Sequence, residues 1–280
     1  MPELPEVETV RLGLEKVLVG HRLSEVKIMR PNLRFPFPDG FQDALKNKRV
    51  ERLNRRGKYL LVELDSLMTL VAHLGMSGRF KIFPSNPPDI ERHDHVLFEI
   101  EGGANVRFND PRRFGFMDLL ETNKLKDSDI LKNMGPEPLE NEFSGPTLIK
   151  RLRGRRSPIK TVLLDQSVVA GLGNIYVSEA LFRAGLSPKR LAVNIQISRA
   201  EALVLAIRTV LVEAISAGGS SLRDHRQPSG ELGYFQHYFS VYGRAGMACP
   251  GCVCNIKETG GIKKIIQSGR STFYCARKQR

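Results

Sequence analysis

Between residues 23 and 120 the chain carries eight short runs of apolar and β-branched residues, most of them separated by turn-forming Gly, Pro, Asn or Asp. The runs span residues 23–29, 49–54, 58–64, 69–74, 79–83, 95–100, 104–108 and 115–120. Strands that follow one another without intervening helices pair with their neighbours, so the pattern predicts a β-sandwich or flattened barrel rather than alternating β–α units.

Helical patterns lie on both sides of this β region. Apolar residues at helical spacing predict an amphipathic helix over residues 6–18, which should pack on the sheet. From Thr122 onward the sequence becomes helical, and Ser198 and Glu201 form a capping box at the start of a further helix. From about Phe235 the pattern is strand-like again. The expected fold is therefore α+β and multidomain.

The charge balance restricts the class of partner. The chain has 43 Lys and Arg against 30 Asp and Glu, a net charge of +13, which favours polyanions and chiefly nucleic acid. Its first residues are acidic and no apolar stretch follows them, so no signal peptide is expected. No apolar run is long enough to predict a membrane span.

The first six residues bring an amine and carboxylates together. Removal of Met1 would leave the secondary amine of Pro2 as the N-terminus, and an α-amine titrates near pH 8 (about 7.7–8.0), so it can act as a nucleophile. Glu3 could exchange protons with the reacting group, and Glu6 could orient it. The alternative is that both carboxylates only stabilise the first turn of the helix.

Three loops of the β region carry candidate nucleic-acid contacts. Lys58 lies at the start of a strand, Met76 lies in a Gly-containing turn, and Arg112 and Phe114 follow the end of a strand. An apolar tip, an arginine and a phenylalanine are side chains that can wedge into a duplex when a base is extruded. Individually, these residues are equally typical of a solvated strand edge, a core position or a surface turn.

In the helical half, the segment from Lys150 to Lys160 has six basic residues and no acid, which is also typical of a solvated helix face. Gly171 and Gly173 allow close approach of a ligand to the backbone. Asn174 is predicted to cap a helix whose free amides favour an anion, such as a phosphate.

The C-terminal region contains all four cysteines. Cys249, Cys252 and Cys275 predict a structural metal site of the zinc-ribbon type, but Lys278 occupies the natural position of a fourth ligand. Cys254 could substitute, with a different loop geometry. Arg270 lies at the predicted tip of the hairpin.

Several motifs occur together in one order: MPELPE, RRGKYLL, HLGMSG, NDPRRFG, LDQ followed by GLGNIY, and GRSTFYC. With these motifs the chain resembles the formamidopyrimidine-DNA glycosylases, bacterial base-excision repair enzymes, from residue 1 to residue 280. The resemblance implies an enzyme that extrudes and excises oxidised purines, 8-oxoguanine and formamidopyrimidines, from duplex DNA and then cleaves the strand by β,δ-elimination.

The resemblance also implies roles for individual residues. Pro2 would be the Schiff-base nucleophile, Glu3 the acid and Glu6 their support, with Lys58 and Arg270 completing the catalytic set. The residues that would contact DNA are Met76, His93, Arg112, Phe114, Arg155, Lys160, Asn174 and Tyr242. Zinc would be structural, at Cys249, Cys252 and Cys275, and weakened by Lys278.

The implied domains are a catalytic β-sandwich over residues 1–121, a helix-two-turn-helix DNA-binding domain over 122–234 and a zinc-finger-like hairpin over 235–280. The segment 220–233 would be a mobile loop over the extruded base. The expected protein is a cytoplasmic bacterial monomer that associates with the nucleoid while it acts.

Three alternatives stay open. An endonuclease VIII-like enzyme for oxidised pyrimidines typically has glycine where this chain has Leu4, and it lacks the set Met76, Arg112 and Phe114. A catalytically silent DNA-binding relative would have lost Pro2 or Glu3. Tautomerases with an N-terminal proline are much smaller chains without a basic tail.

Overall fold

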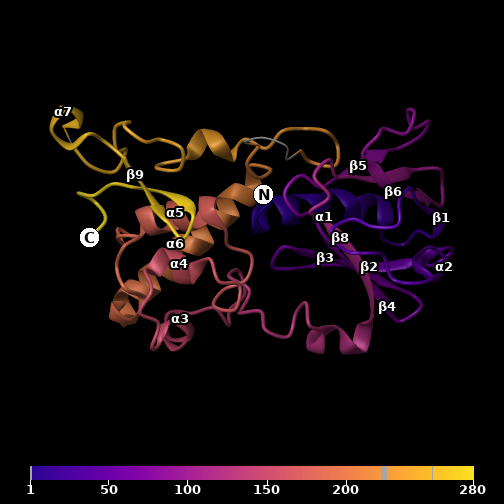
Figure 1. The fold of residues 1–280 in the computed structure, drawn as a ribbon, viewed down its shortest axis with the longest axis horizontal. Helices are drawn as coiled ribbons and strands as arrows, with labels where there is room; N and C mark the ends of the chain where they lie inside the picture. The colour runs from indigo at the N-terminus through magenta and orange to yellow at the C-terminus, as the bar shows by residue number, and fades with distance from the viewer. Residues whose placement is uncertain (1, 222–225, 254) are drawn as a thin grey trace. The chain divides into compact units, whose positions relative to one another are not determined.

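The computed structural model describes residues 2–221, 226–253 and 255–280 and divides into two compact units. Unit 1 comprises Met1–Lys132 and Ala217–Tyr234, and unit 2 comprises Asn133–Ser216 and Phe235–Arg280 (Figure 1). Residues 217–234 thus belong to the same unit as the N-terminal residues. The three-part division expected from the sequence stays a prediction.

Unit 1 contains two four-stranded sheets whose neighbouring strands are all antiparallel. One sheet has the order β1-β6-β7-β5 and the other β2-β3-β4-β8. The strands are β1 (Leu23–Ile28), β2 (Val50–Arg56), β3 (Tyr59–Leu64), β4 (Met68–His73), β5 (Arg79–Phe83), β6 (Asp94–Ile100), β7 (Asn105–Asn109) and β8 (Phe116–Glu121). All eight predicted strands are present, and the predicted sandwich is confirmed.

Helix α1 (Leu4–Leu18) precedes the sheets and packs on β2 and β3. It begins two residues earlier than predicted because Glu3 is its N-cap and Pro5, whose fixed φ suits a first turn, lies just inside it. The unit also has a one-turn helix α2 (Phe41–Leu45), which the sequence did not indicate, and the 3₁₀ helix η1 (Thr122–Asp127).

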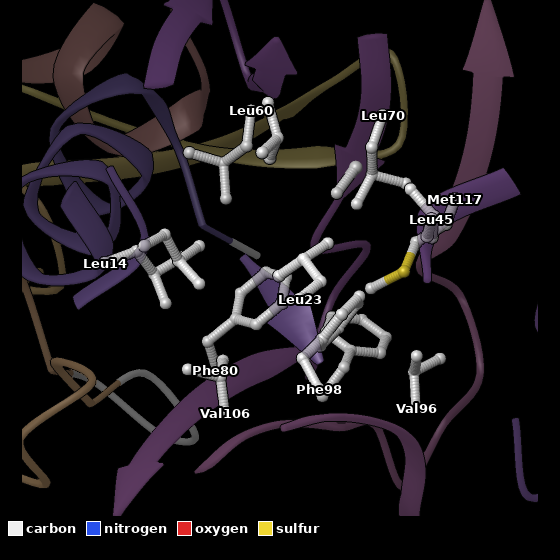
Figure 2. Close-up of a cluster of buried hydrophobic side chains, with 14 of the residues drawn as sticks. Leu14, Leu23, Leu45, Leu60, Leu70, Phe80, Val96, Phe98, Val106 and Met117 are labelled. Atoms are coloured by element: carbon white, nitrogen blue, oxygen red, sulfur yellow. The ribbon is translucent and has the colours of Figure 1, made fainter. Parts of the chain in front are cut away.

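The core of unit 1 joins α1 to both sheets. Figure 2 shows Leu14 of α1 and side chains from both sheets in one buried cluster. Strand β7 is buried along its whole length and β6 at all but one residue, because both lie in the centre of their sheet. This core fixes the positions of the loops at the ends of the strands.

Unit 2 is mainly helical. Its helices are α3 (Gly145–Leu152), α4 (Ile159–Leu163), α5 (Asn174–Arg183), η2 (Ala192–Asn194), α6 (Ile197–Ser216), η3 (Phe235–Tyr238) and α7 (Ile256–Thr259). Helices α3 and α5 pack on α6, which begins within one residue of the predicted capping box.

The C-terminal hairpin of unit 2 pairs β9 (Lys263–Gln267) with β10 (Arg270–Tyr274). Ser268 and Gly269 form its tip with φ angles of 48° and 73°. Across the described residues, every helix is too short or too polar to cross a membrane.

Candidate active site

The N-terminal end of α1 is held by buried hydrogen bonds of Glu6. The backbone N–H of Glu3 donates to Oε2 of Glu6 at 2.8 Å, and the backbone N–H of Ser220 donates to Oε1 of Glu6, also at 2.8 Å. Glu3 and Glu6 are 3% and 2% exposed, although carboxylates are rarely buried without partners. The carboxylate of Glu6 therefore joins the residues next to Pro2 to the start of the segment 220–233.

The glycine before Ser220 permits this contact. Gly219 has a φ of 79°, and a Cβ there would lie 3.2 Å from Oε1 of Glu6. Residues 222–225 of the segment expected to cover the extruded base lie outside the described residues.

Lys58 lies in the tight turn between β2 and β3 and is only 8% exposed. Arg55 fixes this turn, because it donates from Nε to Oε2 of Glu8 at 2.8 Å and from a guanidinium nitrogen to the carbonyl of Gly57 at 3.2 Å. Since Glu8 belongs to α1, the helix that begins beside Pro2 and the turn that carries Lys58 are tied together within unit 1.

His73, at the end of β4, is a candidate site residue that the sequence analysis missed. It pairs with Tyr59 across the sheet, and its Nδ1 accepts a hydrogen bond from the backbone N–H of Gly75 at 3.1 Å. Burial lowers its pKa to about 4, and the positive charges of Lys58 and Arg34 add to this shift. The imidazole is therefore neutral at pH 7, with its proton on Nε2.

Met76, Arg112 and Phe114 are carried by two adjoining loops. Arg112 and Phe114 are exposed, with the Arg112 guanidinium carbon 4.9 Å from the centre of the Phe114 ring, and Met76 is half-buried. The loops meet where Gly75, with a φ of 61°, approaches the backbone of Phe114. We refer to these three side chains as the wedge residues.

Gly75→Ala is expected to destabilise this junction strongly. A Cβ at Gly75 would lie 2.2 Å from the carbonyl carbon of Phe114, and the backbone conformation is left-handed. Gly40 is a matched control, because it has a φ of 66° and no atom within 4 Å of the added Cβ. In urea unfolding, Gly40→Ala should cost about 1–2 kcal/mol and Gly75→Ala at least about 2 kcal/mol more. Equal losses would show that the loops are not packed against each other as described.

His93 lies beside the same pair of loops. Its carbonyl accepts a hydrogen bond from the backbone N–H of Asp110 at 3.0 Å, and its ring lies 6.2 Å from that of His95. The structure thus brings His93 close to the turn of Arg112 and Phe114 within unit 1.

In unit 2, the hairpin strand that starts at Arg270 is held by two predicted site residues. Lys160 is 0% exposed, and its Nζ donates to the carbonyl of Ser271 at 3.0 Å and to Oγ1 of Thr272 at 2.7 Å. Asn174 donates from Nδ2 to the same carbonyl at 2.9 Å. Arg270 itself is exposed.

Asn174 is not the helix cap that was predicted. Gly173 is the N-cap of α5 and Asn174 is its first residue, so the side-chain amide of Asn174 is directed to the hairpin. The extended φ of Gly173, −138°, places the cap one position earlier.

Tyr242 and Arg155 are also fixed in unit 2. Glu179, which the sequence analysis missed, is fully buried and accepts hydrogen bonds from the backbone N–H groups of Ser240, Val241 and Tyr242 at 2.8–2.9 Å. Arg155 donates to Asp165 at 2.8 Å.

The Sγ atoms of Cys249, Cys252 and Cys275 lie within 4.8 Å of one another. Burial and the neighbouring Cys275 raise the pKa of Cys249. The backbone N–H of Lys278 donates to Sγ of Cys275 at 3.4 Å, and its Nζ lies 4.0 Å from the centre of the Phe182 ring. Soft thiolates suit zinc, and the free thiols of Cys249 and Cys275 can supply two of them, whereas Cys252 is in a disulfide and would bind zinc only after reduction. Cys254 lies outside the described residues.

Comparison with known proteins places these features in one family. Residues 1–117 match the family model of the formamidopyrimidine-DNA glycosylase N-terminal domain, and residues 134–226 match that of its H2TH domain. A formamidopyrimidine-DNA glycosylase of Rhodospirillum rubrum is 57% identical over 281 residues, covering all of both chains.

Solved structures agree with this match. The MutM (Fpg) protein of Thermus thermophilus has a TM-score of 0.86 and 38% identity, over 99% of this chain and 98% of that one. A MutM structure in complex with DNA that contains carbocyclic 8-oxo-G has a TM-score of 0.88 and 34% identity, over the whole of both chains. The chain therefore belongs to the formamidopyrimidine-DNA glycosylase family.

Proposed function

We propose that this enzyme excises oxidised purines, 8-oxoguanine and formamidopyrimidines, from duplex DNA and cleaves the strand at the same site. The observation that carries the proposal is the buried arrangement at the start of α1, where Glu6 binds both the N–H of Glu3 and the segment at Ser220. Such an arrangement fixes a nucleophile at Pro2 beside a carboxylate. The DNA-bound relative supports an oxidised purine as the substrate.

In the proposed reaction, the amine of Pro2 attacks C1′ of the damaged nucleotide, the bond to the base breaks, and the departing base takes up the proton that the amine loses. Glu3 protonates the sugar ring oxygen as the ring opens, which leaves an iminium ion between Pro2 and C1′. The iminium acidifies the C2′ proton, so its loss expels the 3′ phosphate. Loss of the C4′ proton then expels the 5′ phosphate in a second elimination, and hydrolysis of the iminium releases Pro2.

The remaining predicted residues have binding roles in this proposal. The wedge residues fill the gap that the extruded base leaves, and His93 binds a phosphate near it. Lys58 binds a phosphate and also assists the elimination. In unit 2, Arg155, Asn174, Tyr242 and Arg270 bind the DNA backbone. Lys160 acts by holding the strand of Arg270, because its ammonium group is buried against that strand.

A zinc ion at Cys249, Cys252 and Cys275 would be structural and would stabilise the hairpin that carries Arg270. Lys278 contributes a cation where a fourth thiolate would bind, and it weakens the site for this reason. We further propose that residues 1–121 form the catalytic domain, residues 122–234 the DNA-binding domain and residues 235–280 the hairpin domain. The enzyme would act as a monomer in the bacterial cytoplasm, where the chromosomal DNA lies.

Lys278→Cys is expected to strengthen zinc binding, because a fourth thiolate completes a tetrahedral site. Lys278→Ala is the control, since it removes the cation over Phe182 without adding a ligand. After challenge with a chelator, metal analysis should show at least about tenfold slower zinc loss from Lys278→Cys than from Lys278→Ala. Full zinc retention by the unmodified protein would show that another group already completes the site.

Cleavage of matched duplexes tests the proposed function. The enzyme is expected to nick a duplex with 8-oxoguanine opposite cytosine and to leave phosphate on both sides of a one-nucleotide gap. A preference for a duplex that carries an oxidised pyrimidine would favour the endonuclease VIII-like alternative. Binding of both duplexes without cleavage would identify a silent DNA-binding relative.

A further inference from the structure

Asp110 presents a fully buried carboxylate at the base of the turn that carries Arg112 and Phe114. It is 0% exposed; Oδ1 accepts a hydrogen bond from the hydroxyl of Ser77 at 2.6 Å and Oδ2 accepts one from the backbone N–H of Gly115 at 2.8 Å. Among the described residues Asp110 forms no ion pair. Burial of a charge with only neutral donors is costly, so a purely stabilising role explains this carboxylate poorly.

Ser77 extends this contact to the other wedge loop. Its hydroxyl donates to Asp110 and accepts a hydrogen bond from the backbone N–H of Arg112 at 3.2 Å. Ser77 is itself only 4% exposed and directly follows Met76. A continuous chain of hydrogen bonds therefore runs from Arg112 through Ser77 to Asp110, and it joins two loops that lie more than thirty residues apart in the sequence.

The backbone of Asp110 holds the strained part of the same turn. Its carbonyl accepts hydrogen bonds from the N–H of Arg113 at 3.2 Å and from Nε2 of His95 at 2.9 Å. Arg113 has a φ of 56°, a left-handed conformation that a residue with a side chain adopts only when its surroundings impose it. Arg112 and Phe114 lie on either side of this residue, so their directions depend on the turn that Asp110 closes.

We propose that Asp110 and Ser77 are positioning residues that hold Met76, Arg112 and Phe114 rigid enough to displace a stacked base. The proposal rests on the proposed function. A wedge must resist the stacking of the duplex, and a wedge on loose loops would lose binding free energy to ordering of those loops. The buried hydrogen bonds order both loops before DNA binds.

The hydrogen bonds of Asp110 and Ser77 should affect the cleavage of two substrates to different extents. Excision of 8-oxoguanine from an intact duplex requires a base to be unstacked, whereas an abasic site has no base to extrude. Loosening the wedge should therefore slow excision more than cleavage at an abasic site. A merely structural role would reduce both rates by the same factor, because both depend on the fraction of folded enzyme.

The test compares single-turnover rates on the two duplexes for Ser77→Ala, Ser77→Thr and Asp110→Asn. Ser77→Ala removes the link to Arg112, and Ser77→Thr keeps the hydroxyl. Asp110→Asn replaces one carboxylate oxygen with an NH₂ group, so one oxygen remains to accept the hydrogen bonds of Ser77 and Gly115. Thr69→Val is the matched control, because Thr69 is fully buried and bonded through its hydroxyl to Thr122 at 2.9 Å.

For Ser77→Ala and Asp110→Asn, the ratio of 8-oxoguanine excision to abasic-site cleavage should fall about tenfold, the factor that corresponds to losing one or two hydrogen bonds. Ser77→Thr should restore most of the ratio, and Thr69→Val should not change it. An unchanged ratio in both Ser77→Ala and Asp110→Asn, or the same fall in Thr69→Val, would overturn the positioning role. If the unmodified enzyme did not cleave at an abasic site, the proposed function itself would be contradicted.

Discussion

An N-terminal extension that is not removed should abolish covalent trapping of the enzyme on damaged DNA. The extension converts the amine of Pro2 into an amide, which is not a nucleophile, while the side chains of Glu3, Glu6 and Lys58 are unchanged. The rate of excision should fall by about 10⁴-fold or more, as for other enzymes that lose their nucleophile. The measurement is borohydride trapping with an 8-oxoguanine duplex, followed on denaturing gels.

Binding of the duplex serves as the control for this variant. Most of the proposed DNA contacts lie far from Pro2 in the sequence and should hold the duplex in the extended chain. Undiminished trapping by the extended chain would show that a different amine reacts. Lys58 is the first candidate, because it lies in the turn tied to α1 through Arg55 and Glu8.

Glu6→Ala is expected to have the second largest effect. It leaves the buried N–H groups of Glu3 and Ser220 without this acceptor, and each loss costs about 1–3 kcal/mol of stability. The start of α1 should shift, and trapping should slow by about 100-fold, since small displacements of reacting groups have effects of that size. Urea unfolding and the trapping rate give the two measurements.

Two variants calibrate this result. Glu6→Gln keeps one acceptor and should lie between Glu6→Ala and the unmodified enzyme in both measurements. Glu15→Ala lies on the same helix but removes a surface ion pair with Arg11, and it should change stability by less than about 1 kcal/mol. If Glu6→Ala trapped DNA at the normal rate, the carboxylate would not be what places Pro2.

The sheets of unit 1 were predictable because their signal is local. Runs of apolar and β-branched residues, with Gly, Pro, Asn and Asp between most of them, mark the strands. The structure places all eight strands within about two residues of the predicted bounds. Helix α2 was missed because a single turn, Phe41–Leu45, is too short to show a helical period.

The long-range hydrogen bonds that position the site residues could not be predicted from the sequence. Asp110 and Ser77 are joined across 33 positions, and Lys160 and Thr272 across 112. Neither contact leaves a periodic pattern in the sequence. From the sequence, Lys160 was expected to contact DNA with the other basic residues of its segment. In the structure its ammonium group is buried against the hairpin strand.

If the amine of Pro2 carries the reaction, borohydride should fix the sugar to that nitrogen. The unmodified enzyme is treated with borohydride in the presence of a duplex with 8-oxoguanine opposite cytosine, the complex is digested, and the modified peptide is identified by mass spectrometry. The expected product is a reduced sugar adduct on the nitrogen of Pro2, with Met1 removed. An adduct on Lys58 or any other lysine, or cleavage of the duplex without any adduct, would contradict this role of Pro2.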